Sequence, residues 1–322
     1  KEKFKNGGDI IVPALTWVSD VSSVLHAGFK PVFVDINKKN LCMDEGELLK
    51  KINKNTRAVF LTHAQGFNGI SNKILNILKL KSIPLIEDVC ESHGATFKNK
   101  KLGNYGLMSN FSFYYAHHMS TIEGGMVSTN NNEIYQKLRM LRAHGMVRES
   151  NDKKITSYYI NKFSDLNKYF IFAYQAYNFR NTEINAIIGR SQLKNLDKNI
   201  KKRNINHKFF LANIDNKKYY TDFDLVGSSN YAFNLILRKP ETKLVNKLIK
   251  KLNKSKIEFR KGSAGGGNQL RQPYLKGLIK KNDYKKFPVT EHIHFYGFYI
   301  GNYPSLTKRK ILQICKIINS VN

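Results

Sequence analysis

Short apolar runs alternate with amphipathic stretches along the first part of the chain. Four runs rich in Ile, Val, Leu and Phe have the length and composition of buried strands: residues 9–13, 31–35, 58–62 and 83–86. Between them, residues 21–26 and 74–80 carry apolar side chains at the spacing of a helix. Strands that alternate with helices predict an α/β fold with a mostly parallel sheet flanked by helices.

The pattern in the middle of the chain predicts two helices and one long irregular segment. Residues 134–141 have helical periodicity, whereas residues 149–169 are polar and aromatic-rich without a clear period, which predicts irregular structure. A second, amphipathic helix is expected to begin at Thr182 and Glu183 and to continue to about Lys208. Its apolar face is formed by Ile184, Ile187, Ile188 and Leu193.

Beyond residue 213, short strands and helices alternate again. Two strands and two helices are predicted there: residues 231–237 and 293–303, and residues 243–252 and 306–318. The glycine-rich stretch 262–273 is expected to be a loop, because glycine destabilises the interior of both elements. With a hinge near Lys208, we expect a large domain over residues 1–208 and a smaller α+β domain over residues 209–322.

The composition indicates a globular protein. Of its 322 residues, 41% are apolar, which is enough for a sizeable core. No run of about 18 apolar residues occurs and the first residues lack the apolar centre of a signal peptide, so we expect a cytoplasmic protein that does not bind a membrane. Cys42, Cys90 and Cys315 are too scattered to predict a disulfide framework or a metal site.

The formal net charge of +30 would suit a protein that binds nucleic acid. However, the lysines are interleaved with Asn and Ile along most polar segments, as in residues 194–203 and 247–254. This pattern favours solvated helix faces, and we expect no nucleic-acid partner. A positive field would still steer a substrate that carries a diphosphate.

Two neighbouring stretches carry the candidate chemistry. The first, Ser82-Ile-Pro-Leu-Ile-Glu-Asp-Val-Cys-Glu-Ser-His-Gly-Ala95, is an apolar strand that runs out into Glu87 and Asp88. The second is Phe111-Ser-Phe-Tyr-Tyr-Ala-His-His-Met-Ser-Thr-Ile-Glu-Gly-Gly-Met126. Together they resemble the active site of the DegT/DnrJ/StrS sugar aminotransferases, which are fold-type I pyridoxal-phosphate enzymes. Those enzymes have a Schiff-base lysine six residues before Glu-Gly-Gly, where this chain has His117, a pattern that resembles the sugar 3-dehydratase subgroup.

The resemblance implies a set of cofactor-binding residues. Asp88 would pair with the pyridine nitrogen of the cofactor through a charge-assisted hydrogen bond and so keep that nitrogen protonated. Trp17 would stack on the pyridine ring, Ser112 would bind the phosphate, and Glu91 would lie beside the ring hydroxyl. Asn178 would reach the phosphate from a neighbouring subunit, which implies a homodimer with shared active sites.

The resemblance also implies where a nucleotide-linked sugar would bind. Its contacts would be His118, Arg180, Gly265, Asn268 and Arg271, and no metal would take part. In the family, several dozen residues precede the strand at residues 9–13, including a Gly-Ser-Ser-Ala loop that binds the cofactor phosphate at a helix N-terminus. We therefore expect either that the sequence is a fragment or that this part of the phosphate site is lost.

The residue at position 117 decides the predicted reaction. A lysine there would bond covalently to the cofactor, whereas the imidazole of His117 cannot. The cofactor can then remain as pyridoxamine phosphate, made with glutamate as amino donor, and react with the C4 ketone of a nucleotide-linked 4-keto-6-deoxy sugar. With a pKa of about 6.5 in the unperturbed state, histidine suits proton transfer from the cofactor's methylene carbon to the leaving C3 hydroxyl. The resemblance thus implies a 3-dehydratase of deoxysugar and O-antigen biosynthesis that releases ammonia.

Three alternatives stay open. A sugar aminotransferase would have to use another lysine, and none stands at the required place. A CDP-linked dehydrase also carries histidine there, but it needs a cysteine-bound iron–sulfur cluster that three scattered cysteines do not predict. A basic regulatory or nucleic-acid-binding module is the non-enzymatic alternative. Outside this motif, the pair His117 and His118 would be taken as structural, and within it His118 is the alternative base.

Overall fold

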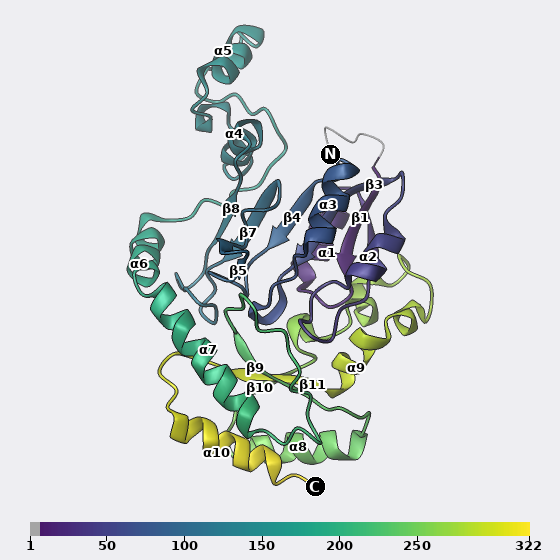
Figure 1. Cartoon of the computed structure of the whole chain (residues 1–322). Coiled ribbons are helices and arrows are strands. Elements are labelled where there is room, and N and C mark those ends of the chain that lie inside the picture. Colours follow the sequence, from purple (N-terminus) through teal and green to yellow (C-terminus); the bar gives the residue numbers. More distant parts are fainter. Residues whose placement is uncertain (1–6) are drawn as a thin grey trace.

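The computed structural model describes residues 7–322, and its larger part is built on a six-stranded sheet (Figure 1). In sheet order the strands are β2 (Lys30–Val34), β1 (Asp9–Pro13), β3 (Thr56–Thr62), β4 (Leu85–Asp88), β7 (Met108–Ser112) and β8 (Gly125–Ser128). All neighbours pair in parallel except β7 with the edge strand β8. The predicted mostly parallel sheet is therefore confirmed. A short hairpin of β5 (Thr96–Phe97) and β6 (Lys100–Lys101) lies between β4 and β7 in the chain.

Helices cover both faces of this sheet, because alternate residues of a strand point to opposite sides. Three helices follow the first three strands: α1 (Val18–His26), α2 (Glu45–Lys51) and α3 (Asn72–Leu80). In β1, Ile10 and Val12 belong to a hydrophobic cluster with α1, whereas Ile11 belongs to one with α2 and α3. The sequence predicted α1 and α3 but not α2, because α2 buries Leu48 alone and so shows no apolar period.

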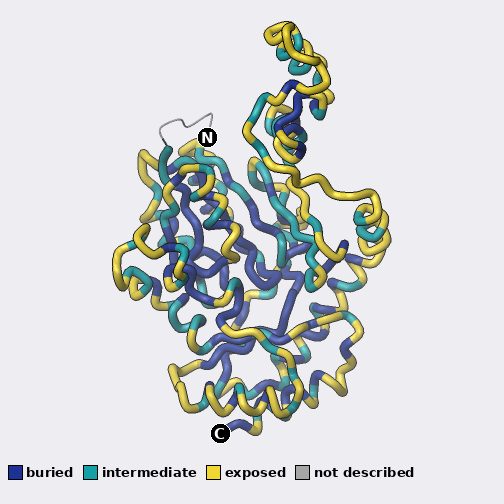
Figure 2. The backbone as a smooth tube through the Cα atoms, turned by 180° about the vertical axis from the view of Figure 1, so that it is seen from behind, coloured by how far each residue is buried: buried dark blue, intermediate teal, exposed yellow. Residues whose placement is uncertain are grey.

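An arm of two helices, α4 (Asn132–Leu141) and α5 (Lys153–Lys162), projects beyond the sheet. Figure 2 shows that its outer end is largely exposed. The expectation of irregular structure over residues 149–169 is wrong where α5 lies. The side chain of Asp152 accepts a hydrogen bond from the main-chain N–H of Lys154 (2.8 Å) and so caps the helix. Because α5 has no buried residue, no apolar period marks it in the sequence.

The helix predicted from Thr182 is two helices, α6 (Glu183–Leu193) and α7 (Leu196–Asn213). Thr182 caps α6 by accepting a hydrogen bond from the N–H of Asn185 (3.3 Å), so the predicted start is confirmed. The predicted apolar face exists, but the chain does not cover it: Ile184 is 69% and Ile187 is 67% exposed.

The C-terminal part contains a three-stranded antiparallel sheet. Its strands are β10 (Phe259–Lys261), β11 (Gly297–Gly301) and β9 (Ala232–Ile236), and its helices are α8 (Thr242–Lys254), α9 (Pro288–Tyr296) and α10 (Lys308–Asn319). The strand predicted over residues 293–303 is shorter than expected, because Pro288 starts a helix that extends to Tyr296. The predicted domain boundary at Lys208 falls within α7 and stays a prediction.

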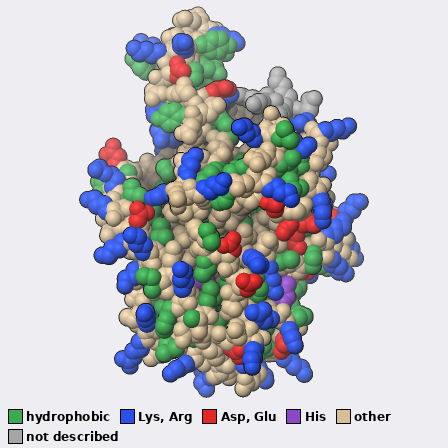
Figure 3. Space-filling view, in the orientation of Figure 1, with side chains coloured by type: hydrophobic (Ala, Val, Ile, Leu, Met, Phe, Trp, Pro, Cys, Tyr) green, Lys and Arg blue, Asp and Glu red, His purple; other side chains and the backbone are tan. Residues whose placement is uncertain are grey.

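The surface gives no sign of a single charged patch on the face drawn in Figure 3, where Lys and Arg side chains are scattered among other residues. Within the described residues, none of the helices combines the length and the apolar character that a membrane crossing requires.

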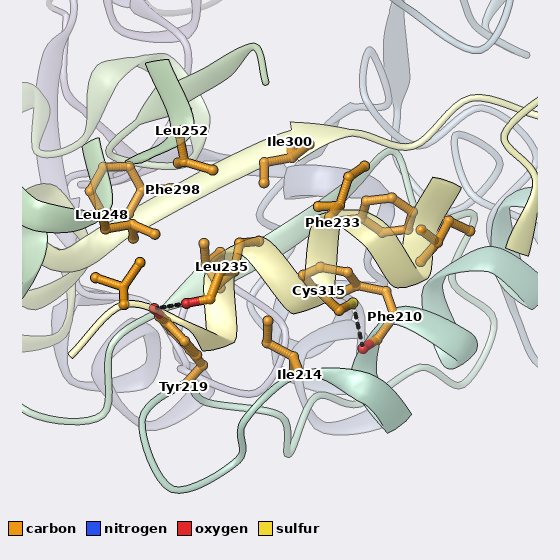
Figure 4. Packing of buried hydrophobic residues seen from close by; sticks show 14 of the residues in the cluster. Phe210, Ile214, Tyr219, Phe233, Leu235, Leu248, Leu252, Phe298, Ile300 and Cys315 are labelled. Atoms are coloured by element: carbon orange, nitrogen blue, oxygen red, sulfur yellow. Dashed lines mark hydrogen bonds between the residues drawn. The ribbon is translucent and has the colours of Figure 1, made fainter. Parts of the chain in front are cut away.

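The core under the small sheet is rich in aromatic side chains (Figure 4). Phe210 from α7 stacks on Phe233 from β9, with ring centroids 4.6 Å apart and planes inclined by 13°. Both rings are fully buried, so they fix α7 against the sheet.

We predict that Phe210→Ala lowers the free energy of unfolding by about 3–5 kcal/mol, because it removes a buried ring and leaves a cavity. Urea denaturation followed by circular dichroism measures this loss. Leu80→Ala is the matched control, because Leu80 is 81% exposed and its truncation should change stability by less than about 0.5 kcal/mol. Equal midpoints for the two variants would contradict this assignment of the core.

Candidate active site

The site is built at the edge of the large sheet where parallel strands end. Asp88 is the last residue of β4, lies opposite Asn110 of β7 and is buried. Its Oδ1 accepts hydrogen bonds from Asn110 Nδ2 (2.9 Å) and from the main-chain N–H of Cys90 (2.9 Å). The carboxylate is therefore held in one orientation at the C-terminal edge of the sheet, where α/β proteins bind ligands.

Glu87, its neighbour, has a structural role. Its fully buried carboxylate accepts hydrogen bonds from the N–H groups of Gly103 (2.8 Å), Tyr105 (2.7 Å) and Gly106 (2.6 Å), and His63 Nε2 lies 3.2 Å away. Burial alone would raise the pKa of Glu87, but the hydrogen bonds from His63, Gly103 and Gly106 outweigh it and lower that pKa. Glu87 thus fixes the loop before β7.

A second buried acid, Asp20 of α1, lies beside Asp88. Its Oδ2 accepts hydrogen bonds from Thr16 Oγ1 (2.5 Å) and Thr62 Oγ1 (2.8 Å). Burial raises the pKa of Asp20 well above its usual value and the negative charge of Asp88 raises it further, against the hydrogen bonds from Thr16 and Thr62. The position of Asp20 beside Asp88 could not be predicted from the sequence, because an acid in the first turn of a helix is common.

Three further predicted cofactor residues belong to this edge. Trp17 follows Thr16 directly and is 56% exposed, so its ring is available for stacking. Ser112 ends β7, two residues beyond Asn110. The carboxylate of Glu91 accepts hydrogen bonds from the main-chain N–H of Gln65 (2.7 Å) and from Gln65 Nε2 (3.2 Å). Burial and the charge of Asp88 raise the pKa of Glu91 to about 7, against the hydrogen bonds from Gln65.

His117 lies in the turn that follows β7. Its main-chain N–H donates to the carbonyl of Tyr114 (3.0 Å), and within residues 7–322 its buried Nδ1 has no hydrogen-bond partner. Burial lowers the pKa of His117 to about 4; Asp88 opposes this shift, and Arg203 and Arg260 add to it. The imidazole is therefore neutral at pH 7.

His118 faces the interior instead. Its ring is buried, and its Nε2 lies 3.1 Å from the carbonyl oxygen of Ser229. Burial lowers the pKa of His118 well below its usual value. A third imidazole, His93, lies 6.1 Å from the ring of His117 and 5.8 Å from that of His118, and burial lowers its pKa to about 3. This geometry favours His117 over His118 as the reactive residue.

A cavity of about 510 Å³ opens beside His117. Its walls come from the turn after β7, from α7 and α10, and from the small sheet, and they include Tyr115, Arg203, Tyr231, Lys256, Arg260, Tyr299 and Lys310. The sequence did not point to Arg203, Tyr231, Arg260 or Tyr299, because they come from distant segments without a common motif.

The predicted sugar-binding loop is engaged in internal contacts. Asn268 is fully buried, and its Nδ2 donates to Glu291 Oε1 (2.8 Å). Arg271 forms a two-point ion pair with the same carboxylate, at 2.8 and 2.5 Å. A side chain at Gly265 would collide with the carbonyl oxygen of Thr16, so this glycine allows the loop to approach the end of β1. These contacts anchor the loop at the edge of the site.

Asn178 and Arg180 lie apart from this cluster. They are exposed on the segment before α6, and Arg180 Nε donates to Asn178 Oδ1 (2.9 Å). Over residues 7–322, a single chain does not bring them to His117.

The residues at the sheet edge suit a pyridoxal-type cofactor. Asp88 is an oriented carboxylate that can pair with a ring nitrogen, and Trp17 offers an exposed flat ring. Within the described residues, Nδ1 of His117 makes no hydrogen bond, so this nitrogen is available to a ligand.

Comparisons with known proteins agree with this arrangement. The sequence pattern of the DegT/DnrJ/EryC1/StrS aminotransferase family matches residues 2–319. The chain is 32% identical over 305 residues to GDP-4-keto-6-deoxy-D-mannose 3-dehydratase of Escherichia coli O55:H7, covering 94% of this chain and 78% of that protein.

Two solved structures are similar in fold. The E. coli GDP-4-keto-6-deoxy-D-mannose-3-dehydratase with bound hydrated PLP superposes with a TM-score of 0.87 at 30% identity, covering 99% of this chain and 81% of that one. A GDP-4-keto-6-deoxymannose-3-dehydratase with a trapped PLP-glutamate geminal diamine superposes with a TM-score of 0.86 at 30% identity, covering 98% of this chain and 81% of that one. These neighbours confirm the predicted fold-type I architecture. The chain belongs to the DegT/DnrJ/EryC1/StrS aminotransferase family.

Proposed function

We propose that this protein is a pyridoxal/pyridoxamine-phosphate-dependent 3-dehydratase of a nucleotide-linked 4-keto-6-deoxy sugar, with glutamate as amino donor. The observation that carries the proposal is His117, an imidazole at the position where the family's aminotransferases have lysine, placed beside the cavity and close to Asp88. The similar dehydratases, one with bound PLP and one with a PLP-glutamate adduct, support the cofactor and the donor.

Each residue at the sheet edge has a proposed task. When bound, the cofactor supplies the electron sink that removal of the C3 hydroxyl requires. Asp88 holds a proton on the ring nitrogen, Trp17 stacks on the ring, Ser112 binds the phosphate and Glu91 lies beside the ring hydroxyl.

His117 is proposed to move the proton. Because burial and two nearby guanidinium groups keep its imidazole neutral at pH 7, it can accept a proton from a carbon acid without first losing one. The resulting imidazolium lies near Asp88, whose charge favours it, and can then protonate the departing hydroxyl.

We further propose a homodimer in which Asn178 and Arg180 complete the partner's site. Two observations support this: both residues are exposed, and the adjoining apolar face of α6 is uncovered in the single chain. A cytoplasmic role in deoxysugar biosynthesis, without nucleic-acid or membrane partners, is part of the same proposal.

The second candidate is a sugar aminotransferase that uses a different lysine. Lys256 and Lys310 line the cavity, so either of them is a candidate for the lysine that an aminotransferase requires. The test is product analysis with the purified protein, pyridoxal phosphate, glutamate and a panel of GDP-, CDP- and UDP-linked 4-keto-6-deoxy sugars. Ammonia and a 3-deoxy-4-keto sugar are expected. An amino sugar product would support the second candidate instead.

We predict that His117→Lys lowers the rate of ammonia release by about 10²- to 10⁴-fold, because it removes the proton-transferring group and bonds the cofactor covalently. Coupled ammonia assays and the visible spectrum of the cofactor measure both effects. Leu80→Lys adds the same charge on a distant exposed side chain and should behave as wild type. Undiminished dehydration by His117→Lys would refute the assigned role.

The pKa of His117 gives a second prediction. Because burial disfavours the cationic ring, the folded protein should keep His117 neutral until the pH falls to about 4, and the unfolded chain should bind this proton first, so acid favours unfolding. NMR of histidine labelled with ¹⁵N measures the midpoint, with His117→Asn to assign the resonance. A midpoint near the value of about 6.5 for free histidine would show that the imidazole is not desolvated.

A further inference from the structure

One wall of the cavity carries an exposed arginine that is flanked by tyrosines. Arg260 lies on the edge strand β10, and the groups around it are Tyr299 of β11, Tyr231 just before β9 and Tyr114 after β7. Tyr299 makes the largest contribution to raising the pKa of Arg260 above its usual value, burial opposes it, and Tyr231 and Tyr114 add to it. Neutral hydroxyls orient the guanidinium but do not neutralise its charge.

A second guanidinium lies deeper in the same wall. Arg203 of α7 is buried, and its Nη1 donates to the main-chain carbonyls of Tyr231 (2.9 Å) and Asn302. Burial lowers the pKa of Arg203 to about 10, so it remains charged at pH 7. Both arginines line the cavity together with His117, and their charges lower the pKa of its imidazole.

The balance of charge in this cavity is therefore positive. Its described lining carries Arg203, Lys256, Arg260 and Lys310 against one acid, Glu258. Glu91 also interacts with Arg260, and its pKa of about 7 leaves it only partly ionised at pH 7. Two fixed cations held by hydroxyls and carbonyls create a preorganised environment for an anion.

The geometry points to Arg260 as the residue that binds an anionic oxygen group of the ligand that reaches His117. A guanidinium has five N–H donors, and the hydroxyls of Tyr299 and Tyr114 that influence Arg260 are too few to engage all five, which leaves donors for a carboxylate or a phosphate. The inference rests on the proposed function, in which two ligands carry such groups: glutamate and the diphosphate of the nucleotide sugar.

The next residue on the strand supplies a matched control. Successive side chains of a strand point to opposite faces, and Lys261 lies over the ring of Phe295, 5.9 Å from its centroid, rather than along the cavity. Arg260→Gln and Lys261→Gln therefore remove the same charge from two faces of β10.

The test is calorimetric binding of two unreactive probes, glutarate and GDP, to the cofactor-loaded protein. Arg260→Gln should weaken the binding of one of these two probes by about tenfold or more, which is the loss expected for a charge-assisted hydrogen bond. Loss of glutarate binding assigns Arg260 to the amino donor, and loss of GDP binding assigns it to the sugar nucleotide. Lys261→Gln should bind both as wild type does.

Arg260→Lys keeps the charge without the planar fork and should recover part of the lost affinity, which separates recognition from misfolding. The inference is overturned if wild type binds neither probe, or if Arg260→Gln binds both within about twofold of wild type. Because binding needs no turnover, this outcome is distinct from failure of the dehydratase, which product analysis decides.

Discussion

The parallel pairing of β4 with β7 is the constraint on which the site depends. It places Asp88 opposite Asn110, whose amide orients the carboxylate, and it starts the turn that carries His117 from the same sheet edge. Glu87 stabilises this pairing, because its buried carboxylate accepts hydrogen bonds from main-chain N–H groups of the loop that precedes β7. Glu87 thus has a structural role, and the role of Asp88 in binding the cofactor is the one we propose.

The electrostatics of the cavity follow from how its charges are buried. The imidazole of His117 is kept neutral by desolvation and by Arg203 and Arg260, while Asp88 supplies the opposite charge nearby. A residue that is neutral at rest and close to a carboxylate is suited to accept and return a proton. The positive charges of the same two arginines also favour the binding of an anion in the cavity. The same two side chains therefore affect both proton transfer and ligand binding.

The sequence predicted the strands β1 to β4 well, because each depends on a local apolar run. The roles of Asp88 and His117 stay predictions that rest on two neighbouring stretches of sequence. The prediction of elements failed where the apolar pattern was weak. The helix α2 buries one residue, Leu48, and α5 buries none, so neither shows an apolar period. Asp20 and Arg260 were missed because only the fold brings them to the site, whereas His93 stands in the same stretch as Asp88 but was assigned no role. The internal contacts of Asn268 and Arg271 depend on Glu291, far from both in sequence.

The central claim is that no lysine anchors the cofactor. Borohydride fixes any covalent bond between lysine and pyridoxal phosphate, so peptide mass spectrometry of the reduced, cofactor-loaded wild type tests the claim directly. We predict no stoichiometric pyridoxyl-lysine anywhere in the chain, including Lys256 and Lys310 at the cavity. One lysine labelled in nearly every molecule would contradict it.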